Sequence, residues 1–166
     1  SRGGIGDLGP AAYEFADFLA AAKQALWQIL PFGPIGYGYS PYSSTSAFAG
    51  NPLLISLERL VEHGWLDRAR VSGLTAEVKA VNYETIFRAK MPLLFEAART
   101  FVTSASGNAR ARFDAFCQDA SWWLDDFVLF DALRARYRLE SWNGWPEELM
   151  RREPSAIAKV RDELSR

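Results

Sequence analysis

The residues LWQILPFGPIGYGYSPYSSTSAFAGNP (26–52) join a short apolar run to a loop rich in glycine, proline, tyrosine and serine. The apolar run Leu26–Leu30 has the length and composition of a buried β-strand. The loop begins at Pro31, where the composition changes at once. A strand that ends in a loop of tyrosines and hydroxyls is typical of a site at the C-terminal end of a barrel strand. The stretch therefore predicts one barrel strand followed by a binding loop.

The side chains of this loop suit a carbohydrate ligand. A tyrosine ring covers the apolar face of a pyranose while its hydroxyl bonds the equatorial groups. Serine hydroxyls both donate and accept hydrogen bonds, as a ligand made of hydroxyls requires. The alternative is a plain surface loop, because glycine, proline and serine all favour turns. Composition by itself leaves both interpretations open.

Three segments of the stretch resemble the N-terminal part of the 4-α-glucanotransferases (amylomaltases, disproportionating enzymes; glycoside hydrolase family 77). They are Leu26–Pro31, Gly33–Tyr42 and Ser46–Pro52. The family carries Leu-Trp-Gln-x-Leu-Pro, then Gly-Pro-x-Gly-Tyr-Gly-x-Ser-Pro-Tyr, then Ser-Ala-Phe-Ala-Gly-Asn-Pro. Further matches, among them Trp142–Pro154, extend the resemblance essentially from end to end.

The rest of the chain is predicted to be mostly helical. Apolar residues at helical spacing and terminal signals such as Pro10 and Gly64 place the helices. The predicted ranges are 10–23, 57–63, 82–104, 113–133, 146–150 and 154–166. The helix over 82–104 carries two apolar stripes and is expected to pack on two sides, with Pro92 kinking or dividing it. Residues 68–79 are read as a loop with a turn at 72–73.

A helix, a tight turn and an apolar strand together form a piece of an α/β unit. The resemblance implies that the piece belongs to a (β/α)8 TIM barrel. Residues 1–52 would be a barrel segment, with the first helix, the second strand and the substrate-binding loop, and residues 53–166 a mostly helical insertion subdomain. The chain opens at Ser1 without a methionine, so we expect a segment of a longer protein whose remainder completes the barrel.

Charge and composition exclude several classes of partner. The 166 residues carry a net charge of −1, so there is no electrostatic case for nucleic acid. No apolar run approaches the roughly 20 residues of a membrane span, and no secretion signal is present. The single cysteine, Cys117, cannot form an internal disulfide and is expected to be a buried structural thiol. The resemblance implies a cytoplasmic enzyme, or a plastid enzyme in a plant.

The family transfers α-1,4-glucan segments between maltooligosaccharides by the retaining route, which needs two carboxylates and no metal or other cofactor. Its nucleophile motif, Arg-x-Asp-His, is absent, because the one histidine, His63, follows Glu62. Asp125 and Asp126 are helix neighbours about 100° apart, so they cannot converge on one bond. Glu147 and Glu148 are likewise neighbours on a predicted helix and are interpreted as surface carboxylates. We therefore expect no catalytic residue in this chain.

The resemblance assigns glucan contacts to four residues. Ser40 and Tyr42 fall where the family contacts glucose units beside the scissile bond. Tyr37 and Phe87 fall on a second glucan-binding groove, with phenylalanine lacking a hydroxyl that some members have. Tyr39 departs from the usual Asp, which leaves the hydrogen bonding of the loop in doubt, and a core or turn role rivals binding for Tyr39 and Phe87.

Two other functions remain open. One is a non-catalytic carbohydrate-binding or interaction module that has kept this part of the fold and lost the chemistry. The other is a helical interaction protein with an incidental tyrosine-rich loop, which predicts no glucan binding. A downstream Arg-x-Asp-His and Glu-Asp-Leu-Gly in the gene would identify the transferase.

Overall fold

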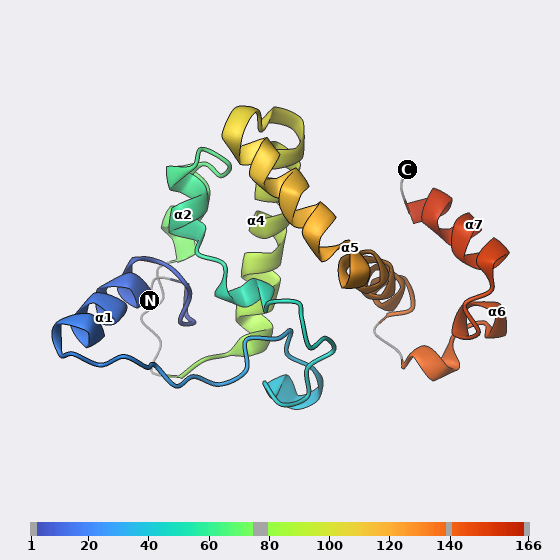
Figure 1. The fold of residues 1–166 in the computed structure, drawn as a ribbon, viewed down its shortest axis with the longest axis horizontal. Helices are drawn as coiled ribbons and strands as arrows, with labels where there is room; N and C mark the ends of the chain where they lie inside the picture. The colour runs from blue at the N-terminus through green and yellow to red at the C-terminus, as the bar shows by residue number, and fades with distance from the viewer. Residues whose placement is uncertain (1–2, 75–79, 139–140, 165–166) are drawn as a thin grey trace. The chain divides into compact units, whose positions relative to one another are not determined.

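The computed structural model describes residues 3–74, 80–138 and 141–164. These residues form helices joined by irregular segments, in two compact units that meet at 111–112, within a long helix (Figure 1). The predicted division of roles at residue 52 stays a prediction. No helix of the described residues combines the length and apolar content needed to cross a membrane.

The first unit begins with helix α1 (Pro10–Ala21) and ends in the first turn of α5. Proline opens α1, where its missing N–H costs nothing. After α1 come the 3₁₀ turn η1 (Tyr37–Tyr39) and the 3₁₀ turn η2 (Pro52–Leu54). Helix α2 (Leu57–Glu62) follows directly. The remaining elements of this unit are α3 (Arg68–Val71), η3 (Ser72–Leu74) and α4 (Tyr83–Ser104).

Local capping explains where these helices begin and end. The Ser56 side chain accepts a hydrogen bond from the backbone of Arg59 at the start of α2, and Gly64 ends that helix with a φ of 73°. Asn82 caps α4 in the same way by accepting from the backbone of Thr85. The predicted helix over 82–104 is confirmed, and it runs through Pro92 as one element.

Three of the expectations about the helices and the cysteine are wrong. Residues 68–74 are not a loop, because the Asp67 carboxylate accepts from the backbone of Ala69 and starts helix α3; the rest of that stretch, 75–79, lies outside the described residues. Helix α4 buries one apolar stripe, while Phe87 and Phe95 of the other stripe are exposed, since nothing in the described part of the chain covers them. Cys117 is only half-buried.

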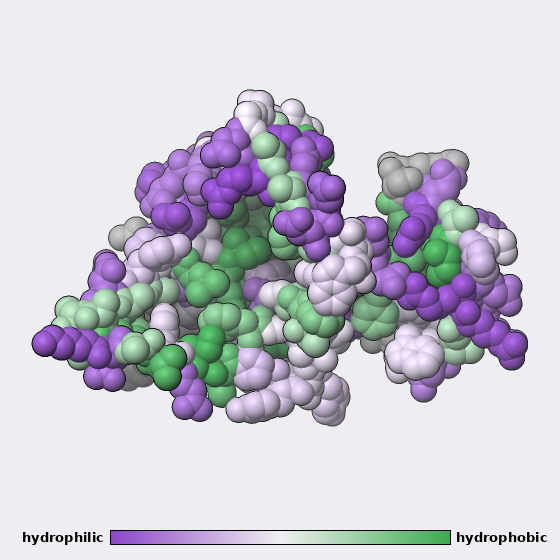
Figure 2. All heavy atoms as spheres, in the orientation of Figure 1, coloured by the Kyte–Doolittle hydropathy of each residue, from purple (hydrophilic) through white to green (hydrophobic). Residues whose placement is uncertain are grey.

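The predicted strand is the largest difference. Residues 26–30 are extended but form no strand, and no strand occurs among the described residues. Leu26 is 90% exposed and Leu30 59%, so the expectation of burial is wrong for this structure. A strand needs a hydrogen-bonded neighbour, and residues 26–30 make no backbone hydrogen bond to another described segment of the chain as they run between α1 and η1 (Figure 1). Figure 2 shows hydrophobic residues gathered along this segment.

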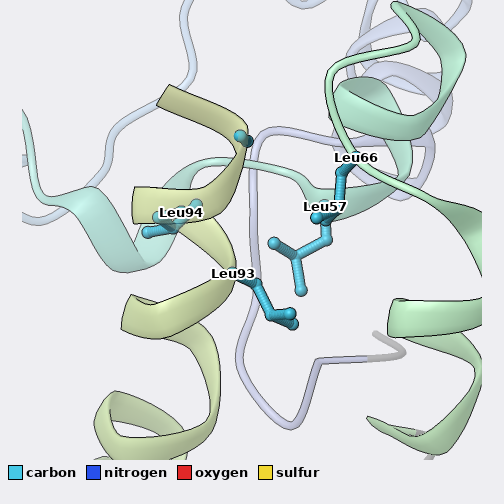
Figure 3. Packing of buried hydrophobic residues seen from close by; sticks show 5 residues of the cluster. Leu57, Leu66, Leu93 and Leu94 are labelled. Atoms are coloured by element: carbon cyan, nitrogen blue, oxygen red, sulfur yellow. The ribbon is translucent and has the colours of Figure 1, made fainter. Parts of the chain in front are cut away.

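Two small cores hold the first unit together. One lies between α2 and α4, where Leu57 and Leu93 point toward each other (Figure 3). It also contains Leu66, Leu94 and Ala97. The second joins the N-terminal turn to η2 and α4 and consists of Ile5, Leu53 and Ile86. The backbone N–H of Leu8 also donates to the carbonyl of Leu54 at 2.8 Å, which fixes the start of the chain against η2.

The second unit contains most of α5 (Gly107–Arg136), the 3₁₀ turn η4 (Trp142–Gly144), α6 (Glu147–Met150) and α7 (Pro154–Leu164). The helices predicted around 113–133, 146–150 and 154–164 are confirmed. Residues of α5, α6 and α7 and the turn between them share one core. Its buried members are Leu129, Leu133, Trp145, Leu149 and Val160. Arg136 of α5 pairs with Glu163 of α7 at 2.7 Å on its surface.

Candidate functional site

The candidate site is the loop 33–50, and glycine allows it to fold back on itself. A Cβ atom added to Gly36 would collide with the backbone carbonyl oxygen of Ser43, and one added to Gly33 would collide with the hydroxyl of Ser44. The two arms of the loop therefore approach more closely than any side chain permits. The backbone N–H of Asn51 donates to the carbonyl of Phe32 at 2.6 Å and closes the base of the loop.

Serine hydroxyls set the turns inside the loop. The Ser44 hydroxyl donates to the carbonyl of Ser46 at 2.7 Å. The Ser46 hydroxyl accepts from the backbone N–H groups of Phe48 and Ala49. Ser40 Oγ accepts from the backbone N–H of Tyr42 at 3.2 Å. Because this contact uses Ser40 only as an acceptor, its hydroxyl proton stays available to a ligand.

The two tyrosines predicted to bind glucan project into solvent. Tyr37 is 97% exposed and Tyr42 75%. Large aromatic side chains bury 150–250 Å² each in most folded proteins, so a fully exposed tyrosine leaves a whole ring face unused. The exposure is compatible with a stacking role for both residues, and it rules out a core role for either within this chain.

A ring contact connects the loop to helix α4. Tyr39 stacks on Tyr83, the first residue of α4, with ring centroids 5.1 Å apart and planes 10° from parallel. Phe87 lies four residues after Tyr83 and therefore on the same face of α4, where it is 47% exposed. The structure thus brings the loop to the helix end that carries Phe87. Tyr83 was not among the predicted site residues; its position four residues before Phe87 was the available signal.

A buried lysine joins the N-terminal turn to the residues that directly follow the loop. Lys90 is 2% exposed and donates from Nζ to the carbonyl oxygen of Leu53 at 2.7 Å. Its Nζ also lies 3.9 Å from the carboxylate of Asp7, which accepts from the backbone N–H of Gly9 at 3.1 Å. One side chain of α4 therefore holds both the N-terminal turn and η2, the elements that flank the loop in space.

Burial shifts the pKa values of both charged groups toward their neutral forms. Desolvation lowers the pKa of Lys90 below its ordinary 10.5, against the opposing attraction of Asp7. Desolvation raises the pKa of Asp7 above its ordinary 3.8, with a smaller contribution from the nearby charge of Glu58, while Lys90 and the Gly9 N–H lower it. Burial favours the neutral form of each group, and the mutual attraction of Lys90 and Asp7 opposes this effect.

These shifts predict how stability depends on pH. Between pH 3.8 and its raised pKa, the folded Asp7 binds a proton that the unfolded chain has lost, so the free energy of unfolding falls as pH rises. Between its lowered pKa and pH 10.5, Lys90 is neutral only when folded, so stability rises with pH. Urea unfolding across pH 3–10 measures both slopes. Asp7→Asn should remove the acid slope, and an unchanged acid slope would contradict the assignment.

The remaining acidic residues singled out in the sequence do not converge. Asp126 pairs with Arg152 at 2.6 Å, and Glu147 pairs with Arg151 one turn along the chain at 2.6 Å. Exposed ion pairs of this kind lie on the protein surface and contribute little to the free energy of unfolding. No group of three or more metal-ligating side chains occurs in the described ranges. His63 caps α2 and stacks on Trp65 at 4.7 Å, which is a structural role.

Known proteins share both the sequence and the arrangement of this chain. A family model for 4-alpha-glucanotransferase, glycoside hydrolase family 77, matches residues 1–166. The 4-alpha-glucanotransferase of Thermus thermophilus is 42% identical over 162 residues, which cover 98% of this chain and 32% of the relative. The chloroplastic/amyloplastic 4-alpha-glucanotransferase of Solanum tuberosum is 40% identical, over 95% of this chain and 28% of its own length.

A solved structure gives the same result. The amylomaltase from Streptococcus agalactiae, in complex with acarbose, superposes with a TM-score of 0.90 at 32% identity. The match covers 99% of this chain and 33% of that one. The chain therefore spans about a third of the length of the proteins it matches.

Proposed function

The chain belongs to the 4-alpha-glucanotransferase family, glycoside hydrolase family 77, and from that membership we propose that it forms the glucan-binding N-terminal part of an enzyme that transfers α-1,4-glucan segments between maltooligosaccharides. The observation that carries the proposal is the folded loop that presents Tyr37 and Tyr42 to solvent. The solved amylomaltase is a complex with acarbose, which supports a saccharide ligand for the whole enzyme.

The proposed reaction is retaining. One carboxylate attacks the anomeric carbon and releases the leaving chain, whose oxygen takes a proton from a second carboxylic acid. A hydroxyl of the acceptor sugar then gives its proton to that second group and displaces the enzyme carboxylate. In our proposal both carboxylates come from parts of the enzyme beyond these 166 residues, and no cofactor takes part.

This chain contributes the contacts that hold the glucan during transfer. Tyr37 stacks on a glucose unit in the second groove, and Tyr42 covers a glucose unit beside the scissile bond. The Ser40 hydroxyl donates to the sugar, since its oxygen already accepts from the backbone of Tyr42. Phe87 extends the aromatic surface along α4, and its 47% exposure leaves it accessible.

The extended segment 26–30 is proposed to become the second strand of a (β/α)8 barrel. Its apolar side chains are exposed here, and Trp27 contacts Phe15 of α1 at a ring-centroid distance of 4.9 Å. A solvent-exposed apolar segment with unpaired backbone groups is stable in a strand only when neighbouring strands cover it. The remainder of the barrel is the partner that we assign to it, in an enzyme of the cytoplasm or the plastid.

The proposal predicts that Tyr37→Ala weakens the binding of maltoheptaose roughly tenfold, because one stacking surface and its hydroxyl are lost. Titration followed by tryptophan fluorescence measures the dissociation constant. The matched control is Tyr13→Ala, which removes an exposed tyrosine of α1 outside the loop and should leave binding unchanged. Equal affinity of the Tyr37→Ala variant and the unchanged chain would contradict the assignment of Tyr37.

Incubation of the same samples with maltotriose tests where the carboxylates lie. We expect no glucose from this chain, because in our proposal both carboxylates of the retaining reaction lie outside these 166 residues. Accumulation of glucose together with longer maltodextrins would place the catalytic carboxylates within these 166 residues after all.

A further inference from the structure

We propose that Tyr39, by stacking on Tyr83, is a positioning residue that holds the loop in the conformation in which Tyr37 and Tyr42 meet an α-glucan. The inference rests on the proposed function and deepens it.

The backbone of Tyr39 has an unusual conformation that something must stabilise. Its φ is 58°, directly after Gly38 with a φ of 68°. Glycine adopts this left-handed region freely, and Asp or Asn tolerates it through local hydrogen bonds, whereas tyrosine disfavours it. Two successive residues with positive φ turn the chain sharply between Tyr37 and Tyr42. A tyrosine with this backbone conformation destabilises the fold of the loop unless a contact of its ring offsets the cost.

Tyr83 offers that contact on a fixed base. It is the first residue of α4, directly after the capping Asn82. Its side chain is half-buried and packs against the core of Ile5, Leu53 and Ile86. A tyrosine has only two side-chain torsions to restrict, so a ring held in this way is a rigid platform. By stacking on Tyr83, Tyr39 is connected to the core of the first unit.

The other bonds of the loop tip are local. In the described residues, the hydrogen bonds of 37–42 join Tyr39 to Gly36, Ser40 to Tyr37, and both Tyr42 and Ser43 to Ser40. They shape the tip but cannot orient it toward α4. The Tyr39–Tyr83 stack is the ring contact that reaches from this tip to a helix. Without it, only a fraction of molecules would hold the tip in place, and apparent affinity falls in proportion to that fraction.

The test compares Tyr39→Asn, Tyr39→Phe and Tyr83→Ala with the unchanged chain. Asparagine keeps the preference for a positive φ and removes the ring, whereas phenylalanine keeps the ring. The first readout is the rate of chymotrypsin cleavage after Tyr37 and Tyr42, which reports order of the loop without any sugar. The second is the dissociation constant of maltoheptaose. The urea midpoint of each variant shows that the fold is intact.

Tyr39→Asn and Tyr83→Ala are expected to raise both the cleavage rate and the dissociation constant roughly two- to tenfold. Tyr39→Phe should match the unchanged chain in both. In the Tyr83→Ala background, Tyr39→Asn should have no further effect. Tyr83 also packs on the core, so Tyr83→Ala can unfold the chain. In that case Tyr39→Asn by itself tests the proposal.

The two proposals fail in different ways. If the chain binds maltoheptaose and Tyr39→Asn binds as tightly and is cleaved no faster, the positioning role is wrong and the proposed function stands. If the unchanged chain binds no maltoheptaose but the variants are cleaved faster as predicted, the proposed function is wrong and the ordering of the loop by the stack is confirmed.

Discussion

Replacing Lys90 by alanine is expected to lower the free energy of unfolding by about 3–5 kcal/mol, the usual cost of removing one partner of a buried ion pair. The substitution leaves the Leu53 carbonyl without its donor at 2.7 Å and the Asp7 carboxylate without its counter-charge. It also opens a cavity, because the side chain is only 2% exposed. Urea unfolding followed by far-ultraviolet circular dichroism measures the change.

The matched control separates the charge from the volume. In the double variant Lys90→Met with Asp7→Asn, a side chain of similar length fills the space and no buried charge remains. We expect it to recover a large part of the lost stability, with a residual cost of about 1–3 kcal/mol for the unpaired Leu53 carbonyl. A Lys90→Ala variant that unfolds at the same urea concentration as the unchanged chain would show that the lysine does not join the two elements.

Replacing Gly36 by alanine is expected to abolish measurable glucan binding by this chain. The new Cβ would occupy the position of the Ser43 carbonyl oxygen, and a backbone atom cannot rotate aside as a flexible side chain can. The loop must therefore open, which changes the placement of Tyr37 next to Gly36. We expect a rise in the maltoheptaose dissociation constant well beyond tenfold and a loss of about 1–3 kcal/mol of stability.

Gly50→Ala is the matched control for this effect. It lies in the same stretch, but a Cβ at this position meets nothing within 4 Å. Its affinity and unfolding midpoint should match those of the unchanged chain. If Gly36→Ala binds maltoheptaose as well as Gly50→Ala does, the close approach of the two arms is not needed for binding.

Local signals in the sequence predicted most of the helices. Pro10 at the start of α1, Asn82 before α4 and Gly64 after α2 act through hydrogen bonds and torsions of adjacent residues. The same kind of signal is present at Asp67, whose carboxylate starts α3 where the sequence predicts a loop. The position of the turn-rich loop could likewise be predicted, because glycine and serine act on neighbouring backbone groups.

Contacts between distant residues could not be predicted in this way. Lys90 falls on the buried stripe of its helix by spacing alone, but its acceptor, Leu53, lies 37 positions away. Tyr39 stands out in the sequence only as a departure from the family pattern, and nothing near it in the chain indicates Tyr83 as its stacking partner. The apolar run at 26–30 looked like a buried strand, yet pairing depends on neighbours that these residues do not contain.

Motifs in the sequence by themselves determined the family. The sequence also determined most of the helices and the loop that carries Tyr37, Ser40 and Tyr42, because capping, periodicity and turn formation depend on residues only a few positions apart. Only the tertiary structure decided that Lys90 joins the elements flanking the loop and that Tyr39 rests on α4. Those contacts depend on how the chain closes over long separations, and packing of the whole unit selects them rather than any local preference.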